Sequence, residues 1–597
     1  IFVYFFTIKP AFKAYSGVKN LSVSAKALKA SFAKNDMDLV QKEMKTFSTK
    51  YTKFENDVKP LYWASFIPYV SDFKNGVKAG HYLGEAGKES IESIAPYADL
   101  IGFKKGTSSF SEKTADDRLQ TAVLTLDKVL GRIDGISENI RKAEEHVDKI
   151  NPNFYPKTLG KTVVRGRIIN IKEQVKGVSS LFVDAKPLLK KLPEILGKGG
   201  EKTYLIIFQN QYERRATGGF LTSYAFFHIK DGKIKIEHSE DIYSLDQSIA
   251  SHPRAPDEIL TYHKGVSQFY IRDSNLSPDF VESIKLFNSL YNRSSLKEDY
   301  DGIISLDAKV LVDMLTIFGD TEVDGITFSA KEDARCDCPQ VIYQLFDLVD
   351  RPVNYIKTNR KGILGDLMYA LFYKAIGFSP SKYWGTLSET MYSNLEQKHI
   401  LLYFKESDLQ EAAERINFAG RIRPFNGDYL HVNNVNFAGA KSNLFITEEI
   451  DSKSTVNSDG TIKREITLEY KNPYSHSDCN LERGGLCLNA VLRNWLRVYV
   501  PKGSKLISFD GSRTKVQQYN DLDKTVFEGF LTVSPEGRSE VKVVYTLPSD
   551  IKAKDYTLMV QKQGSVQKEL QQLKITVGGR KLYDDDFDKD KTFKQSL

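Results

Sequence analysis

The spacing of apolar residues divides the chain into several parts, and residues 14–199 carry the spacing of helices. Apolar side chains recur there at alternating intervals of three and four positions, as in helices that pack through a seam. One such run comprises Met37, Val40, Met44, Phe47, Tyr51, Phe54, Val58 and Leu61. Short loops between long helices favour antiparallel neighbours. The pattern predicts a helical bundle or stalk, with a partner-binding coiled coil as the alternative.

Residues 200–440 alternate short apolar runs with amphipathic ones. The predicted strands cover residues 204–208, 220–229 and 302–306. A polar loop ending in Thr217, Gly218 and Gly219 separates the first two strands, and a helix follows the third. Helical spacing then dominates residues 332–419 and predicts a helical cover. This order of strands and helices predicts a central α/β domain.

Beyond residue 440 apolar and polar residues alternate. The alternating runs cover residues 444–450, 462–470, 492–500, 525–533, 539–547, 556–561 and 573–577. Short strands joined by turns predict an immunoglobulin-like β-sandwich over residues 441–578. The remaining residues, 579–597, include the run DDDFDKDK and are predicted to form a polar, disordered tail. The predicted fold class is therefore multidomain α+β.

The first residues, IFVYFFTI, are uniformly apolar, yet they supply less than half of the ~20 residues that a membrane-spanning helix requires. The sequence has no initiating Met, so the simplest interpretation is that residues 1–13 are the end of a single-pass transmembrane anchor. The alternative is an apolar strand or a helix buried in a core. An anchor predicts a protein of the cell membrane whose bulk lies on the extracytoplasmic side.

Net charge and cysteine positions indicate which partners and which cellular compartment to expect. The net charge of +7 over 597 residues includes no concentrated basic run, so no nucleic-acid partner is predicted. Cys479 and Cys487 flank a Gly-rich loop between two predicted strands, and a disulfide closing this hairpin is predicted. Cys336 and Cys338 lie in CDCP, where a direct bond is expected to be strained. The chain lacks the C-x-x-C pairs of a zinc site, so the cysteines indicate an oxidising, extracytoplasmic setting.

One candidate binding site lies in the loop between the first two predicted strands of the central domain. Arg214 and Arg215 follow Glu213 and shortly precede Gly218 and Gly219. Two guanidinium groups beside glycine N–H groups are suited to phosphate or pyrophosphate. The alternative is that the arginines pair with Glu213 and nearby acids while the glycines serve a turn.

A second candidate lies in the turn-rich segment that contains Arg272, Asp273 and Asp279. Loops at strand ends commonly carry functional groups. The two carboxylates would hold Mg²⁺ through oxygen ligands while Arg272 and Arg215 bind phosphate oxygens. Magnesium and arginine would then share the pyrophosphate charge during a displacement. The alternative is an Arg–Asp staple that caps the following helix.

The first loop also carries a family motif. Its N-x-x-E-x-R-x-T-G-G-F pattern consists of Asn210, Glu213, Arg215, Thr217, Gly218, Gly219 and Phe220. This pattern resembles the signature of the bacterial family called domain of unknown function 4012. The segments RDSNLSPDF, DGIISLDAKVLVDML, KHILLYF and NFAGAKSNLFI follow in the order found in that family. The similarity spans residues 200–577 and implies a bacterial membrane-anchored surface protein.

A more distant similarity is to the LytR-CpsA-Psr phosphotransferases. It rests on the arginine-bearing strand entry, the R-D pair and the segment DGIISLDAKVLVDMLTIFGDTEVDG. Those enzymes transfer glycopolymers from polyprenyl pyrophosphate carriers to cell-wall acceptors, using an arginine cluster and acidic residues with magnesium. Their SDT-type acidic motif is not recognisable here. The resemblance implies catalytic roles for Arg272, Asp273 and Asp279, phosphate binding by Arg214, Arg215, Arg272, Gly218 and Gly219, and Mg²⁺ binding by Asp273 and Asp279.

Two hypotheses about function follow from these patterns. In the first, the protein binds or transfers a polyprenyl-pyrophosphate-linked glycopolymer at the cell envelope. In the second, it is a non-catalytic structural or adhesion protein whose stalk and sandwich assemble with further copies or with a surface partner. The first hypothesis requires Arg215, Arg272 and either Asp273 or Asp279 to converge on one pocket beside an apolar channel. In the second, these side chains scatter or pair off.

Overall fold

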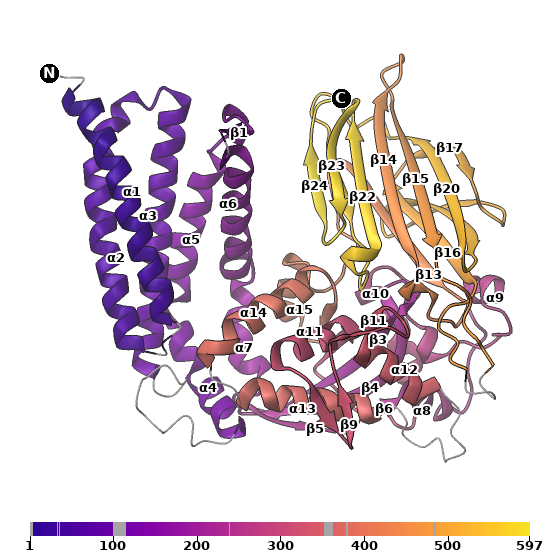
Figure 1. Ribbon diagram of the computed structural model, residues 1–597. Coiled ribbons are helices and arrows are strands. Elements are labelled where there is room, and N and C mark those ends of the chain that lie inside the picture. The colour runs from indigo at the N-terminus through magenta and orange to yellow at the C-terminus, as the bar shows by residue number, and fades with distance from the viewer. Residues whose placement is uncertain are drawn as a thin grey trace.

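The computed structural model describes residues 4–32, 34, 36–98, 115–160, 162–237, 239–350, 362–377, 380–480 and 485–597. Figure 1 shows a helical bundle and a sheet-rich C-terminal region that both project from a central domain of helices and sheet. The chain enters the bundle at the end that is far from the central domain. The predicted combination of an N-terminal helical region with a C-terminal sheet-rich region is confirmed.

The N-terminal region consists mainly of helices packed side by side. They are α1 (Lys9–Phe32), α2 (Met37–Val58), α3 (Pro68–Ile94), α4 (Ala115–Val129), α5 (Ile133–Asp148), α6 (Val164–Ser179) and α7 (Lys186–Ile195). The buried apolar side chains of α2 all belong to its predicted stripe, namely Met37, Val40, Met44, Phe54 and Val58. They pack against Ile91 and Val77 of α3, as an intramolecular seam requires.

The segment predicted to end a membrane anchor is described only in part. Residues 1–3 lie outside the described residues, and Tyr4–Ile8 form a short π-helical turn that leads into α1. Phe5 and Phe6 are exposed, so this turn is not part of a core. Within the ranges that the structure describes, no helix combines the length and apolar character needed to cross a membrane.

The central domain is built on one mixed sheet of order β12-β7-β3-β4-β5, in which β6 also pairs with β4. Its strands are β3 (Lys202–Arg215), β4 (Gly218–Lys230), β5 (Lys233–Ile236), β6 (Glu240–Asp241), β7 (Gly302–Asp307) and β12 (Ile400–Phe404). Leu205 and Ile207 enter one apolar cluster, whereas Tyr204 and Ile206 enter another, because successive strand side chains point to opposite faces. Both faces of the sheet are therefore covered.

Helices provide most of that cover. They are α8 (Ile242–Gln247), α9 (Asp257–Tyr262), α10 (Phe280–Tyr291), α11 (Ala308–Phe318), α12 (Gln340–Asp350), α13 (Gly362–Gly377), α14 (Pro380–Glu396) and α15 (Ser407–Arg415). Between α11 and α12 lie the short strands β8 (Thr321–Val323), β9 (Ile326–Phe328), β10 (Glu332–Asp333) and β11 (Cys338–Pro339). α10 joins the cluster on one face of the sheet, and α15 joins the cluster on the other.

The polar segment predicted as a loop between the first two strands is instead the end of a β-hairpin. β3 continues to Arg215 and β4 begins at Gly218, which leaves Ala216 and Thr217 for the turn. The pairing register shifts between Asn210 and Arg214, so the extra residues form a bulge. Bulges re-aim side chains next to functional sites. Polar composition is typical of a loop and therefore predicted one. It carries no information about the backbone pairing that extends β3 and β4 here.

The C-terminal region is a sandwich of two six-stranded sheets, ordered β18-β19-β16-β13-β21-β24 and β17-β20-β15-β14-β22-β23. Its strands are β13 (Asp428–Asn436), β14 (Thr447–Val456), β15 (Ile462–Asn472), β16 (Leu492–Pro501), β17 (Lys505–Asp510), β18 (Gln517–Asp521), β19 (Lys524–Val533), β20 (Gly537–Thr546), β21 (Thr557–Gln561), β22 (Gln571–Val577), β23 (Arg580–Asp586) and β24 (Lys591–Lys594). Apolar side chains from both sheets form one core. Each sheet contains a parallel pair, β13 with β21 and β14 with β22, so an immunoglobulin-like arrangement is not confirmed.

The prediction of a disordered tail at residues 579–597 is wrong. β23 pairs with β22 and β24 pairs with β21, each at the edge of one sheet. Phe587, between these strands, is buried in the sandwich core. Acidic composition favours a disordered tail. Here, backbone pairing with the sheet edges and the burial of the Phe587 ring keep the segment ordered despite its charges.

Two disulfides account for all four cysteines. Cys479 and Cys487 form the predicted pair. Cys336 and Cys338 are also bonded, with Cα atoms 5.1 Å apart, which lies within the usual range for a disulfide. Asp337 between them adopts a left-handed backbone (φ 47°), which folds its two neighbours toward each other and lets the direct bond form.

Candidate functional site

The main candidate site is a cavity of about 330 Å³ where the ends of β3 and β7 meet α11, α12 and α13. Charged and apolar residues both line it. The charged side comprises Glu213, Arg215, His263, Arg272, Asp273, Asp307 and Lys441. The apolar side is lined by residues that include Val310, Leu311, Ile342, Leu345, Phe346 and Met368. The volume falls within the ~300–1,000 Å³ that is typical of small-molecule sites.

Arg215, the last residue of β3, anchors the charged side. Its side chain is 1% exposed, and Nη2 lies 3.0 Å from Glu213 Oε1 and 3.6 Å from Asp273 Oδ1. Nη1 donates a hydrogen bond to the carbonyl oxygen of Asn436. The guanidinium also lies over the rings of Phe220 and Phe437, which exclude water from it. Among the described residues, Nε finds no hydrogen-bond partner.

Arg272 and Asp273 enter the same cavity from the short 3-10 helix Ile271–Asp273. Arg272 Nη1 donates to Asp246 Oδ2 at 2.7 Å, and its guanidinium stacks 3.8 Å from the ring centroid of Tyr270. Burial raises the pKa of Asp246 above its usual value although Arg272 opposes this effect. Asp273 is 1% exposed, and its Oδ1 accepts no hydrogen bond from the residues that the structure describes. Arg215 Nε and Asp273 Oδ1 thus make no hydrogen bond with the described residues, although Asp273 Oδ1 is ion-paired with Arg215 Nη2.

Glu213 and Lys441 complete the charged side, with Lys441 Nζ 3.3 Å from Glu213 Oε2. Burial alone would raise the pKa of Glu213, but Lys441 and Arg215 together lower it below the ordinary value. Glu213 is thus held as a carboxylate. The sequence marks Glu213 as a partner for the arginines and as part of the family motif, and Lys441 also stands in a segment that carries the family resemblance, but no local chemical pattern assigns either residue to the site.

Arg214 and Arg215 are adjacent in sequence, but their side chains pair with different residues. Arg214 points toward the sandwich, where Nη1 lies 3.0 Å from Glu448 Oε2 in β14. Its backbone N–H donates to Asn443 Oδ1. Arg214 does not line the cavity, whereas Arg215 does. Alternation along a strand explains the difference, because successive side chains point to opposite sides.

Gly218 and Gly219 shape the β3–β4 hairpin, and the Gly219 amide is not available to a phosphate because it already donates a hydrogen bond within the hairpin. Gly219 N–H donates to Gln209 Oε1 at 2.8 Å. A Cβ at Gly219 would come within 2.3 Å of the Asn210 backbone, and Gly218 has φ 148°. These two positions need glycine for close backbone approach and for a left-handed conformation.

Asp279 lies outside the cavity and caps a helix. Oδ1 accepts the backbone N–H of Glu282 in the first turn of α10. Oδ2 accepts hydrogen bonds from Arg421 Nε at 2.8 Å and from the Ile422 backbone N–H. Burial raises the pKa of Asp279 although Arg421 lowers it. The structure therefore brings Arg215, Arg272 and Asp273 together and leaves Asp279 apart from them.

Comparison with known proteins gives a match for part of the chain. No curated protein sequence matches it. Among solved structures, the "X-Ray Structure of Lin1025 protein from Listeria innocua" is 10% identical, with an alignment that covers 47% of this chain and 95% of that chain at a TM-score of 0.18. Residues 199–335 match the family described as "Protein of unknown function (DUF4012)", which confirms the family resemblance for this segment.

Proposed function

We propose that the cavity binds the pyrophosphate and the first prenyl units of a polyprenyl-pyrophosphate-linked glycopolymer at the cell envelope. The observation that carries this proposal is the convergence of Arg215, Arg272 and Asp273 on one cavity whose lining also includes many apolar residues of α11, α12 and α13. A ligand with an anionic head and a hydrocarbon tail matches both kinds of lining residue. Two disulfides support an oxidising location outside the cytoplasm.

The charged side is suited to bind the head group together with a cation. Arg215, Arg272 and Lys441 are opposed by Glu213, Asp273 and Asp307 in the lining and by Asp246, which pairs with Arg272. Since the carboxylates outnumber the cationic groups, a pyrophosphate would need an additional cation. Mg²⁺ is commonly held by one or two carboxylates plus substrate phosphates. Asp273 fits this role because its Oδ1, 3.6 Å from Arg215 Nη2, accepts no hydrogen bond from the described residues, whereas both oxygens of Asp279 already accept hydrogen bonds.

The reaction that this arrangement favours is a phosphoryl displacement. A wall hydroxyl attacks the phosphorus that carries the glycopolymer and forms a new P–O bond. The bond from that phosphorus to the bridging oxygen breaks, and polyprenyl monophosphate leaves. Asp273 accepts the hydroxyl proton, and Arg215 and Arg272 stabilise the charge that develops on the phosphate oxygens. Mg²⁺, when bound, supplies additional charge neutralisation.

A second candidate function is a non-catalytic structural role in the envelope. It is favoured by the pairing within the cavity, where Arg215 contacts Glu213 and Arg272 contacts Asp246. In that case the network joins the hairpin to the rest of the domain, and the apolar wall is part of its core. The two functions differ in whether the cavity takes a ligand.

A binding experiment separates the two functions. We would titrate the purified chain with a soluble short-chain prenyl pyrophosphate, with inorganic pyrophosphate and with the corresponding prenyl alcohol, each with and without Mg²⁺. The proposal predicts tightest binding for the prenyl pyrophosphate with Mg²⁺. Arg272→Ala should weaken that binding roughly 10- to 100-fold, because charge-assisted hydrogen bonds contribute ~1.5–3 kcal/mol.

Two further variants make the experiment specific. Arg254→Ala is the matched control, since Arg254 is exposed and pairs with Asp257 away from the cavity. Leu345→Gln places an amide on the apolar wall and should weaken binding of the prenyl compound but not of inorganic pyrophosphate. If no ligand binds to a folded chain, the non-catalytic function is favoured.

A further inference from the structure

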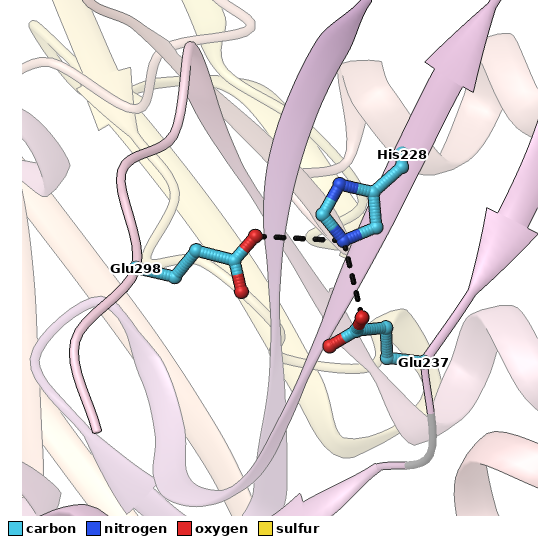
Figure 2. A group of neighbouring side chains, drawn as sticks. All are labelled: His228, Glu237 and Glu298. Carbon is cyan, nitrogen blue, oxygen red and sulfur yellow. Dashed lines mark ion pairs between the residues drawn. The ribbon is translucent and has the colours of Figure 1, made fainter.

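A separate cluster of potential metal ligands lies at the other end of the β3–β4 hairpin. Figure 2 shows His228, Glu237 and Glu298 converging from different segments. His228 belongs to β4, Glu237 follows β5, and Glu298 lies in the connection from α10 to β7. His228 Nε2 is 3.5 Å from Glu237 Oε1 and 3.5 Å from Glu298 Oε1. One ligand atom from each residue lies within 4.8 Å of the other two.

The backbone holds each of these residues in place. His228 is paired with Lys235 across the β4–β5 ladder and with Thr203 across β3–β4. Glu237 N–H donates to the Phe226 carbonyl oxygen. Glu298 N–H donates to the Tyr291 hydroxyl at 2.7 Å, and that hydroxyl donates back to the Glu298 carbonyl oxygen at 2.9 Å. Positions fixed in this way reduce the entropy lost when a ligand binds.

The histidine ring is oriented as a metal ligand requires. Nδ1 lies 3.2 Å from Thr203 Oγ1, and a hydrogen bond donated by Nδ1 would leave the lone pair of Nε2 toward the carboxylates. Nε2 is buried and finds no hydrogen-bond partner among the described residues. Its side chain is 14% exposed, whereas those of Glu237 and Glu298 are 41% and 40% exposed, which provides access for an ion. A ring nitrogen that makes no hydrogen bond and faces two carboxylates at 3.5 Å is an arrangement that a shared cation would complete.

We propose that His228, Glu237 and Glu298 bind a divalent transition metal ion of the Zn²⁺ class. Metal–ligand distances of ~2.0–2.2 Å at tetrahedral angles separate neighbouring ligand atoms by roughly 3.3–3.6 Å, which agrees with the two 3.5 Å separations. Neutral imidazole with two carboxylates also balances a dication. Lys235 Nζ, 3.5 Å from Glu237 Oε1, competes for one oxygen but is 76% exposed and free to swing away.

The ion would act as a structural clip. It ties the β4–β5 hairpin to the connection that precedes β7. From Phe220, which lines the cavity, to His228 the chain runs eight residues along β4, or about 26 Å. The metal site is therefore distinct from the cavity and does not depend on the proposed function.

The test is Zn²⁺ binding to the purified chain, freed of affinity tags and treated with a chelator. We would titrate ZnCl₂ calorimetrically and measure the melting temperature with and without the ion. Wild type should bind one Zn²⁺ per chain and melt at a higher temperature with Zn²⁺, because a ligand that binds only the folded state stabilises it. Both cysteine pairs are disulfide-bonded, so thiols do not contribute.

Variants localise the binding. His228→Asn should abolish both the calorimetric signal and the thermal shift, and Glu298→Gln should weaken binding at least tenfold. His81→Asn is the matched control, since His81 pairs with a single carboxylate, Glu55, on the helical bundle; it should behave as wild type. Absence of Zn²⁺ binding in wild type, or equal binding in His228→Asn, would overturn the proposal. Circular dichroism of each variant verifies that it is folded.

Discussion

Lys398 Nζ lies 2.7 Å from Asp590 Oδ1, and this buried ion pair joins the central domain to the last residues of the sandwich. Lys398 immediately precedes His399 and β12, and Asp590 lies between β23 and β24. Asp590 also accepts hydrogen bonds from the Lys562 backbone N–H and from Asn417 Nδ2. The acidic C-terminal run therefore holds the sandwich against the central domain.

Replacing Asp590 should destabilise the protein strongly. Asp590→Ala leaves the Lys398 ammonium buried without its partner, and breaking such a pair typically costs ~3–5 kcal/mol. Urea denaturation followed by fluorescence measures the effect. Asp585→Ala is the control, because Asp585 is exposed in the same segment and its removal should change the free energy of unfolding by less than about 0.5 kcal/mol. Equal effects of the two substitutions would contradict the bridging role.

His431 should make the stability fall in mild acid. Burial lowers the pKa of His431 to about 4, and Lys398 and Arg497 act in the same direction. The unfolded chain, with a His pKa of ~6.5, binds more protons between those values, so the free energy of unfolding decreases as pH falls from about 6.5 to 4.

His431→Gln removes this proton linkage. Between pH 7 and pH 5 the wild-type protein should lose about 2 kcal/mol more stability than the variant. Denaturation curves at both pH values test the difference. His476→Gln is a control on an exposed histidine. Parallel losses in wild type and His431→Gln would show that His431 does not carry the pH dependence.

The two aspartates predicted to share a metal should have different phenotypes. Asp279→Ala removes the cap of α10 and should lower the free energy of unfolding by ~0.5–2 kcal/mol or more, since Arg421 also loses one of its carboxylate partners. Binding of prenyl pyrophosphate should persist. Asp273→Asn should instead reduce the Mg²⁺-dependent part of that binding. If the folded Asp279→Ala variant lost Mg²⁺-dependent binding of prenyl pyrophosphate, Asp279 would belong to the binding site.

The four cysteines should be unreactive in the native chain. Iodoacetamide should label none of them before reduction and all four after reduction and unfolding, because both pairs are bonded. Peptide mass spectrometry without reduction should identify the linked peptides. A labelled Cys336 in the oxidised protein would show that the CDCP pair is open.

Short-range sequence patterns predict the roles of some candidate site residues but not of others. Asp279 is followed three residues later by Glu282, a spacing typical of a helix N-cap, which favours the capping alternative over the predicted metal-binding role. Glu213 and Arg215 were recognised as neighbours because they lie two residues apart. His263 and Lys441 stand in no chemical motif, so nothing local indicated that they would line the same cavity.

Amphipathic periods along the chain specified the bundle helices, the strand–helix alternation of the central domain and most strands of the sandwich, because these patterns depend on residues a few positions apart. The fold alone brought Arg272 and Lys441 to the end of β3, turned Arg214 toward Glu448, and added the C-terminal residues to the sheet edges. Those outcomes rest on backbone pairing and on ion pairs between distant segments, which residue spacing does not encode.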